Sequence, residues 1–397
     1  MNNLFLAKLS FVALIGTSFY SNSTLASIVT KCSPAKNGTK CVFSGTGSNL
    51  TDLMNKTIKQ YPKDLTLIIN QSNTLKPLTI SNSNNITISL AANVTLKAPK
   101  RKDSSWKNQN ALITVENSNN FIFKGSSSST SIIDGQGSTW WNQVNDRPVL
   151  VEINNTSGIT VQFIELINSP KYNLHIVSSD NININNIAIN APADSPNTDG
   201  VNTHNISNMS IDTITVNNGD DGIAVNSDQG PSSAIRINNV TLINGHGLSI
   251  GSQVYNPVFD MTVNKVSFKN SSHGLRIKTR CPSEDPSKCP QTKTGSVSNI
   301  SYENITMTGV VYPLYFDLDY GTNGNYSYVN LSNITYSNVV ATNSKNPASL
   351  ICSENNGCTN IVFNSVNIDT NGNCQGINGG SYDKVVPCPF NHNAVPH

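Results

Sequence analysis

The sequence predicts an all-β protein that folds as a single-stranded, right-handed parallel β-helix, and three observations support this prediction. Short alternations of apolar and polar residues follow one another, each bounded by asparagine or glycine. They recur at a period in the twenties without any helical pattern, as in solenoids whose coils stack on one another. A sandwich or barrel of antiparallel strands is the competing fold, but two-residue hairpin turns are scarce here.

One series of alternations places a short strand in each expected coil. Its members begin 27, 26, 26, 39 and 29 residues apart. Asparagine suits such coils because it tolerates left-handed turns, and stacked asparagines form ladders between parallel strands. The members are Asn186–Ile189, Thr213–Val216, Asn239–Leu242, Lys265–Phe268, Asn304–Met307 and Asn333–Tyr336.

A second series aligns on glycine and brings unusual residues into one column. Its glycines lie 22, 25 and 27 residues apart, and stacked strands are about 4.8 Å apart. The residues just before these glycines are Asp199, Asp221, His246 and His273, and Asp220 adjoins Asp221.

Two basic residues extend this patch. Arg276 and Lys278 lie two and four residues after the last glycine of the series, on the same face of a strand. Alone, an Asp-Gly is usually a turn, a single histidine is usually structural, and Arg-x-Lys is usually a solvated face. Their shared register favours a catalytic patch with crowded carboxyl groups, as glycoside hydrolysis requires.

The chain is expected to comprise a signal segment and one domain. Met1–Ala26 has one lysine, a short apolar run and small residues before the expected cleavage point. Residues 27–397 then form the β-helix domain, with opening coils and a cap in 27–120 and closing coils after Ala341. We expect a secreted, extracellular protein with no membrane helix.

Cysteines and charge restrict the other possibilities. Eight cysteines suit an oxidising compartment, and we expect four local disulfides: Cys32–Cys41, Cys281–Cys289, Cys352–Cys358 and Cys374–Cys388. A zinc site is the alternative, but no C-x-x-C spacing supports it. The net charge of +2 argues against nucleic acid as a partner, so an acidic ligand would need a local basic cluster.

Four ordered motifs resemble those of the polygalacturonases, family 28 of the glycoside hydrolases. They are Asn197–Gly200, Gly219–Asp221, Gly245–Gly247 and Arg276–Lys278, preceded by Ile133–Gly137 and a Trp140-Trp141 pair that we expect to be packing residues. The resemblance covers most of the chain and implies a pectin lyase-like solenoid. It also implies hydrolysis with inversion, without metal or cofactor.

Roles follow from the resemblance, residue by residue. Asp220 would be the general acid, and Asp199 and Asp221 would activate water across carboxyl groups about 6.5–9.5 Å apart. His246 would tune the protonation of the acid. Substrate contacts are implied for the residues Arg276, Lys278, Tyr320 and Asn197, with Tyr312 as the alternative to Tyr320.

The sequence departs from relatives at Asn202, where many have aspartate, and at Gly222, where secreted fungal members have cysteine. His246 favours plain polygalacturonate, because rhamnogalacturonan hydrolases typically lack that histidine. We therefore expect a monomeric, endo-acting polygalacturonase whose partner is the pectin backbone, with a mildly acidic optimum. The alternatives are exo action, a rhamnogalacturonan or xylogalacturonan hydrolase, a calcium-dependent pectate lyase, and a non-enzymatic carbohydrate-binding solenoid.

Overall fold

The computed structural model describes most of the chain. Side chains are described for residues 27–143, 145–283, 295–318, 320–321, 329–352 and 358–370, and the backbone alone for 373–375, 377–378 and 382–383. The expected signal segment Met1–Ala26 lies outside these residues and stays a prediction. Within the described part, no helix has the length and apolar character needed to cross a membrane.

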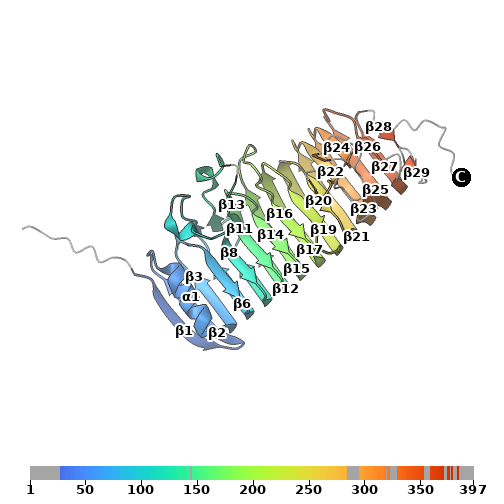
Figure 1. The fold of residues 1–397 in the computed structure, drawn as a ribbon. Coiled ribbons are helices and arrows are strands. Elements are labelled where there is room, and N and C mark those ends of the chain that lie inside the picture. The colour runs from blue at the N-terminus through green and yellow to red at the C-terminus, as the bar shows by residue number, and fades with distance from the viewer. Residues whose placement is uncertain are drawn as a thin grey trace, which may run out of the picture.

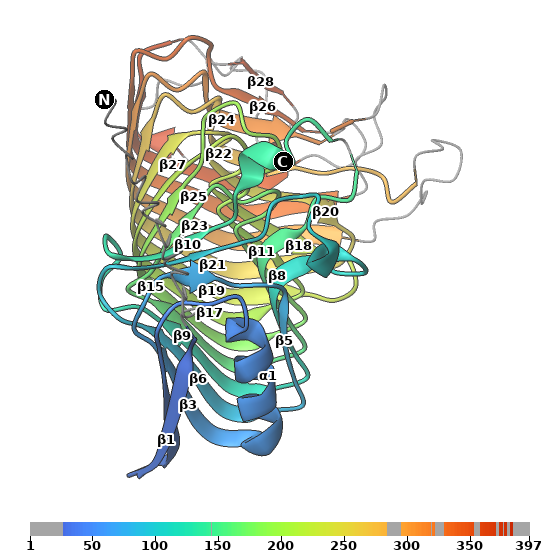
Figure 2. The ribbon, with the colours of Figure 1, turned by 90° about the vertical axis from the view of Figure 1, so that its left-hand side faces the viewer.

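The chain winds into an elongated parallel β-helix, which confirms the predicted fold class (Figures 1 and 2). Two long sheets run along it, and successive coils add neighbouring strands to each. The smaller sheet carries β5 Leu78–Ser81, β8 Ala111–Glu116, β11 Val149–Asn154, β14 Leu174–Val177, β16 Val201–His204, β18 Ile223–Ser227, β20 Leu248–Val254, β22 His273–Lys278, β24 Tyr312–Asp317, β26 Ser349–Ile351 and β28 Asn373–Gln375.

The larger sheet contains the long strands. Its members are β1 Val29–Ala35, β2 Gly38–Ser44, β3 Lys63–Ile69, β4 Asn73–Thr74, β6 Asn84–Leu90, β7 Val94–Lys97, β9 Asn119–Lys124, β10 Ser131–Asp134, β12 Ser157–Gln162, β13 Glu165–Ile167, β15 Asp180–Asn190, β17 Ser207–Asn218, β19 Ser232–Asn244, β21 Pro257–Lys269, β23 Gly295–Thr308, β25 Val329–Thr342, β27 Cys358–Ile368, β29 Ile377–Asn378 and β30 Tyr382–Asp383.

Residues in the left-handed region interrupt each long strand. In β15, Asn186 has φ of 50°, and the buried side chains on either side of it are three positions apart, at Ile184 and Ile187. Strict alternation would place one of them outside. The left-handed residue therefore acts as a bulge that returns the next side chain to the core.

This geometry corrects one predicted alignment. Ile334 pairs with Ile300, whereas Ile305 pairs with Val339, 34 residues further along. The predicted equivalence of Asn304–Met307 and Asn333–Tyr336, which begin 29 residues apart, is therefore wrong. The cause is that β25 contains two left-handed asparagines, Asn333 and Asn338. The equivalent of Asn304 is the second of them, Asn338.

Ladders between coils stabilise the outer surface, as predicted. Asn338 donates to the side-chain oxygen of Asn304 at 2.7 Å, and Asn304 donates to Asn264 at 2.8 Å. Inside the solenoid, aromatic rings stack in the same way: Tyr302 on Tyr336 at 5.0 Å, and Tyr336 on Phe363 at 5.2 Å between centroids.

A cap closes the N-terminal end of the core. The helix α1, Leu50–Gln60, lies at this end of the solenoid (Figure 2). It buries Leu50, Met54 and Ile58 at intervals of four residues. The sequence alternations did not predict this helix. It covers an apolar end that a solenoid would otherwise expose. Two short 3-10 helices, Ser104–Trp106 and Gly137–Thr139, occupy loops.

Disulfides and aromatic packing agree with two further predictions. The disulfides Cys32–Cys41 and Cys352–Cys358 are present. The other two expected pairs include Cys289 and Cys388, which lie outside the described residues. Trp140 is buried and packs edge-on against Trp106 at 5.4 Å between centroids.

The predicted glycine column exists and requires glycine. A Cβ on Gly200 would lie 2.4 Å from the carbonyl oxygen of Gly222 in the next coil, so no side chain fits there. This close stacking brings the residues before each glycine together at one edge of the smaller sheet. The residues after the glycines pair in register: Val201, Ile223, Leu248 and Leu275.

Candidate active site

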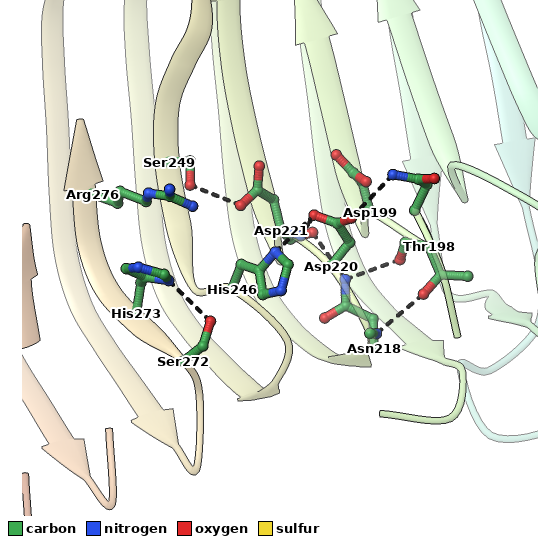
Figure 3. A network of polar contacts seen from close by, with 12 residues as sticks. Thr198, Asp199, Asn218, Asp220, Asp221, His246, Ser249, Ser272, His273 and Arg276 are labelled. Carbon is green, nitrogen blue, oxygen red and sulfur yellow. Dashed lines mark hydrogen bonds and ion pairs between the residues drawn. The ribbon is translucent and has the colours of Figure 1, made fainter. Parts of the chain in front are cut away.

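Buried asparagines fix the backbone that carries the acids. Asn173 donates its amide to the carbonyl oxygens of Thr198 and Asp199 at 3.2 and 3.0 Å. Asn218, at the end of β17, donates to those of Thr198 and Asp221, both at 2.9 Å (Figure 3). Because both amides are buried and bonded, the turns before β16 and β18 have little freedom.

Asp220 lies at the centre of three donors. His246 Nδ1 is 2.9 Å from its Oδ1, and the Asp221 backbone N–H donates to the same oxygen at 2.8 Å (Figure 3). Asn197 donates its side-chain amide to Oδ2 at 3.2 Å. The Asp220 side chain is 19% exposed and the His246 side chain 39%, so both are accessible from solvent.

Asp221 is buried and paired. Its Oδ2 accepts from Lys278 Nζ at 2.7 Å, and its Oδ1 accepts from Ser249 at 2.8 Å. Burial lowers the pKa of Lys278, but the charge and hydrogen bond of Asp221 outweigh it, and the pKa lies above its usual value. The sequence predicts that Lys278 binds a substrate carboxylate. In this structure its ammonium group instead forms an ion pair with Asp221.

Asp199 is held differently from the other two acids. It is buried, and Asn202 donates to its Oδ2 at 2.7 Å. Burial, followed by the negative charges of Asp220 and Asp221, raises the pKa of Asp199 well above its usual value. The substitution at position 202, a departure from relatives, therefore supplies a neutral donor to this carboxyl group.

Asp220 and His246 form a hydrogen-bonded pair, and each changes the pKa of the other. Burial raises the pKa of Asp220, but the hydrogen bond and charge of His246 outweigh burial and hold it below its usual value. Conversely, the bond to Asp220 raises the pKa of His246 despite burial. At mildly acidic pH the pair carries one proton, located mainly on the imidazole.

The second basic residue lies beside this cluster. Arg276 forms an ion pair with Asp317 of β24, and its guanidinium lies 4.9 Å from the centre of the Tyr320 ring. Lys278 Nζ is 5.0 Å from the same ring. The Tyr320 ring therefore lies within about 5 Å of both cations, and its contact with substrate stays a prediction. Tyr312, the alternative, stacks on His273 instead, at 5.4 Å.

A cleft of about 210 Å³ opens over the acids and Tyr320. Its lining includes residues that were not anticipated, among them Tyr172, His204 and Arg280. Arg280 is exposed, and among the described residues it forms no ion pair. Because it continues the alternation from Arg276 and Lys278, the sequence pattern contained a signal for it.

The same groups form the one potential metal-ligand cluster in the described part of the chain. One ligand atom each from Asp220, Asp221 and His246 lie within 4.8 Å of one another. Lys278 already bonds Asp221, so a cation there would be repelled by the ammonium. The chemistry of the donors therefore favours proton transfer over metal binding.

The observed environments differ among the three carboxyl groups. Asp220 is paired with His246, Asp221 is paired with Lys278, and Asp199 is buried beside the neutral amide of Asn202. When carboxyl groups lie in different environments, one group can donate a proton while another stays ionised. The site can therefore protonate a leaving oxygen and activate a water molecule.

Comparison with known proteins identifies the family. The model of the family described as Glycosyl hydrolases family 28 matches residues 59–385, most of the chain. The chain belongs to this family. The predicted resemblance is thus confirmed, and the sequence motifs and the acid cluster lie within the matched region.

Curated relatives of this family 28 protein have both endo and exo names. Endopolygalacturonase A of Aspergillus flavus is 30% identical over 294 residues, covering 68% of this chain and 75% of its own length. Exopolygalacturonase clone GBGA483 of Arabidopsis thaliana is 30% identical over 334 residues, covering 78% of this chain and 72% of its own length. A polygalacturonase of Juniperus ashei is 31% identical over 285 residues, and this chain spans about half of its length, 53%.

Solved structures share the fold. An exopolygalacturonase from Thermotoga maritima aligns with a TM-score of 0.69 at 18% identity, covering 86% of this chain and 88% of its own. A polygalacturonase from Erwinia carotovora aligns with a TM-score of 0.69 at 22% identity, covering 89% of this chain and 100% of its own. At these identities the likeness establishes the β-helix alone.

Proposed function

We propose that this family 28 protein hydrolyses the α-1,4-galacturonosidic bonds of polygalacturonate, acting within the chain and inverting the anomeric configuration. The observation that carries the proposal is the crowding of Asp199, Asp220 and Asp221 in one cleft, each with a different hydrogen-bond partner. The names of the relatives direct the choice of substrate.

Asp220 acts as the general acid through its pair with His246. The pair holds one proton, and transfer from Nδ1 to Oδ1 across 2.9 Å converts it into neutral imidazole and protonated carboxyl. That carboxyl donates to the glycosidic oxygen as the bond breaks. The Asn197 amide and the Asp221 backbone N–H then stabilise the carboxylate that is left.

Asp199 and Asp221 hold and activate the attacking water. Asp221 accepts a hydrogen bond from the ammonium of Lys278, which gives the cleft a second carboxyl group that is separate from the pair of Asp220 and His246. The oxygens of Asp220 and Asp221 lie within 4.8 Å, closer than the ~6.5–9.5 Å between carboxyl groups typical of inverting enzymes. Inversion is therefore proposed on the family resemblance, and the anomeric product tests it directly.

Cations and the Tyr320 ring bind the substrate on the leaving side. Arg276 and Lys278 both lie against this ring, and a galacturonate carboxylate would enter between them. Arg280 adds a further positive charge to the same cleft. A polyanionic backbone complements this arrangement better than a neutral glycan does.

Endo action is supported by a hollow that continues past the acids. A second cavity of about 660 Å³ shares Tyr172 and Asn197 with the first and extends over β11 and β14. Sugar residues can therefore lie on both sides of the scissile bond. We further propose that the protein is exported and works outside the cell as a monomer on pectin.

The experiment that tests this function follows both products by proton NMR during digestion of de-esterified polygalacturonate. Inverting hydrolysis produces β-configured reducing ends first, and endo action produces oligomers of mixed length. A product with a 4,5-double bond, detected by ultraviolet absorbance, would instead identify a lyase. Parallel digests of rhamnogalacturonan and xylogalacturonan measure the alternative backbones, and release from those alone would refute the substrate assignment.

A further inference from the structure

Arg147 lies two coils before Asp199 and contacts the loops of the two coils that follow its own. It belongs to the loop before β11. Its NH1 donates to the carbonyl oxygens of Pro170 at 3.1 Å and of Pro196, and its NH2 donates to the side-chain oxygen of Asn197. One guanidinium thus links three successive loops at the edge of the sheet that carries the acids.

In the described part of the chain, the hydrogen-bond partners of Arg147 are neutral oxygens. Among the described residues no carboxylate forms an ion pair with it, and its Nε is buried without a hydrogen-bond partner. A surface arginine kept only for solubility would leave its guanidinium in water. Arg147 is instead half-buried, and taking part of this cation out of water among amide oxygens has an energetic cost.

The contact fixes the orientation of one amide. A guanidinium can only donate, so the Asn197 oxygen must face Arg147, and the amide nitrogen then faces Asp220 Oδ2 at 3.2 Å. The flipped orientation would direct the oxygen at a carboxylate. Asn197 has φ of 53°, a left-handed conformation that asparagine tolerates, so the backbone holds the amide between both partners.

We propose that Arg147 is a positioning residue for Asp220 and acts through the side-chain amide of Asn197. This inference rests on the proposed role of Asp220 as general acid. When Asp220 gives up its proton, the oriented amide stabilises the new carboxylate. The oriented amide also fixes the rotation of the Asp220 carboxyl group, whose alignment with the glycosidic oxygen matters in the chemical step, so Arg147 contributes to kcat more than to KM.

The test compares Arg147→Gln, Asn197→Gly and the double variant. Glycine at 197 keeps the left-handed backbone and removes only the amide. Because a hydrogen bond to a charged group contributes strongly, we expect Arg147→Gln to lower kcat roughly ten- to a hundredfold, with KM changing less than about twofold. We expect the double variant to be no slower than Asn197→Gly alone, because both substitutions remove the same donor.

A pH profile adds a readout that a purely structural role would not change. Loss of the amide donor destabilises ionised Asp220, so the alkaline limb of kcat against pH moves to higher pH in Arg147→Gln. Arg236→Gln is the matched control, because Arg236 is an exposed arginine of β19 on the other sheet. Arg147→Lys keeps the charge without the planar fork and is expected to recover less than half of the lost activity.

Several results would overturn the inference. A raised KM with unchanged kcat would make Arg147 a substrate-binding residue, and additive effects in the double variant would show that it does not act through Asn197. Full activity in Arg147→Lys would mean that charge alone suffices, and this variant decides the matter if Arg147→Gln fails to fold. Inactive wild-type protein would refute the proposed function, whereas active wild type with Arg147→Gln matching Arg236→Gln would refute this inference alone.

Discussion

Substituting Lys278 by methionine tests the electrostatics of the site. Lys278 is 6% exposed and Asp221 2% exposed, and their charged atoms are 2.7 Å apart. After the substitution, Asp221 keeps one side-chain donor, Ser249. Methionine preserves most of the side-chain volume, so the loss reports the unpaired charge rather than a cavity. Breaking a buried pair in this way lowers the free energy of unfolding by about 3–5 kcal/mol.

The assay is denaturant unfolding followed by far-UV circular dichroism and by tryptophan fluorescence. Both probes are needed because a solenoid can unfold in parts. A free energy of unfolding can be derived only if the two probes give coincident transitions. Lys97→Met, an exposed lysine of β7, is the control and should change stability by no more than about 0.5 kcal/mol.

A second substitution separates charge from packing. Adding Asp221→Asn to Lys278→Met removes the uncompensated carboxylate, and it should restore at least about 2 kcal/mol of the lost stability. The reasoning is refuted if Lys278→Met is as stable as the Lys97→Met control. It is also refuted if the double variant unfolds as easily as Lys278→Met alone.

Three further predictions follow from the site and the coil. His246→Ala should lower kcat and move the alkaline limb of the pH–rate profile to lower pH, because the imidazole with its raised pKa no longer holds the proton of the Asp220 pair; an unmoved limb would contradict this. Arg280→Gln should raise KM for polygalacturonate about fivefold, with kcat unchanged, as steady-state kinetics would show. Gly200→Ala should lower the free energy of unfolding by about 2 kcal/mol, because its Cβ would lie 2.4 Å from the carbonyl of Gly222; an unaltered denaturation midpoint would exclude the stacking argument.

The sequence was sufficient to predict the column of acids because local backbone geometry sets it. Gly200 and its equivalents are required where coils approach closely, and this requirement repeats at the period of the coil. Once the period is known, Asp199 and Asp221 must be neighbours in adjacent coils. The register failed at Asn333 because each long strand has two left-handed positions that look alike in sequence.

Side-chain partners were harder to predict than positions. Arg276 and Lys278 were correctly placed on one face of β22, but their ion pairs with Asp317 and Asp221 depend on which rotamers meet across coils. Arg147 was missed altogether. Its loop has no periodicity, and its contacts cross two coils, so no spacing in the sequence indicates that it reaches the site.

The proposed metal-independent hydrolysis depends most directly on Asp220 as the general acid. The decisive measurement is release of reducing ends from de-esterified polygalacturonate with a chelator present, comparing wild type with Asp220→Asn, which keeps the size of the side chain. We predict release of saturated oligomers by wild type and a loss of at least a thousandfold, roughly, in the variant. Full activity in Asp220→Asn would contradict the central claim.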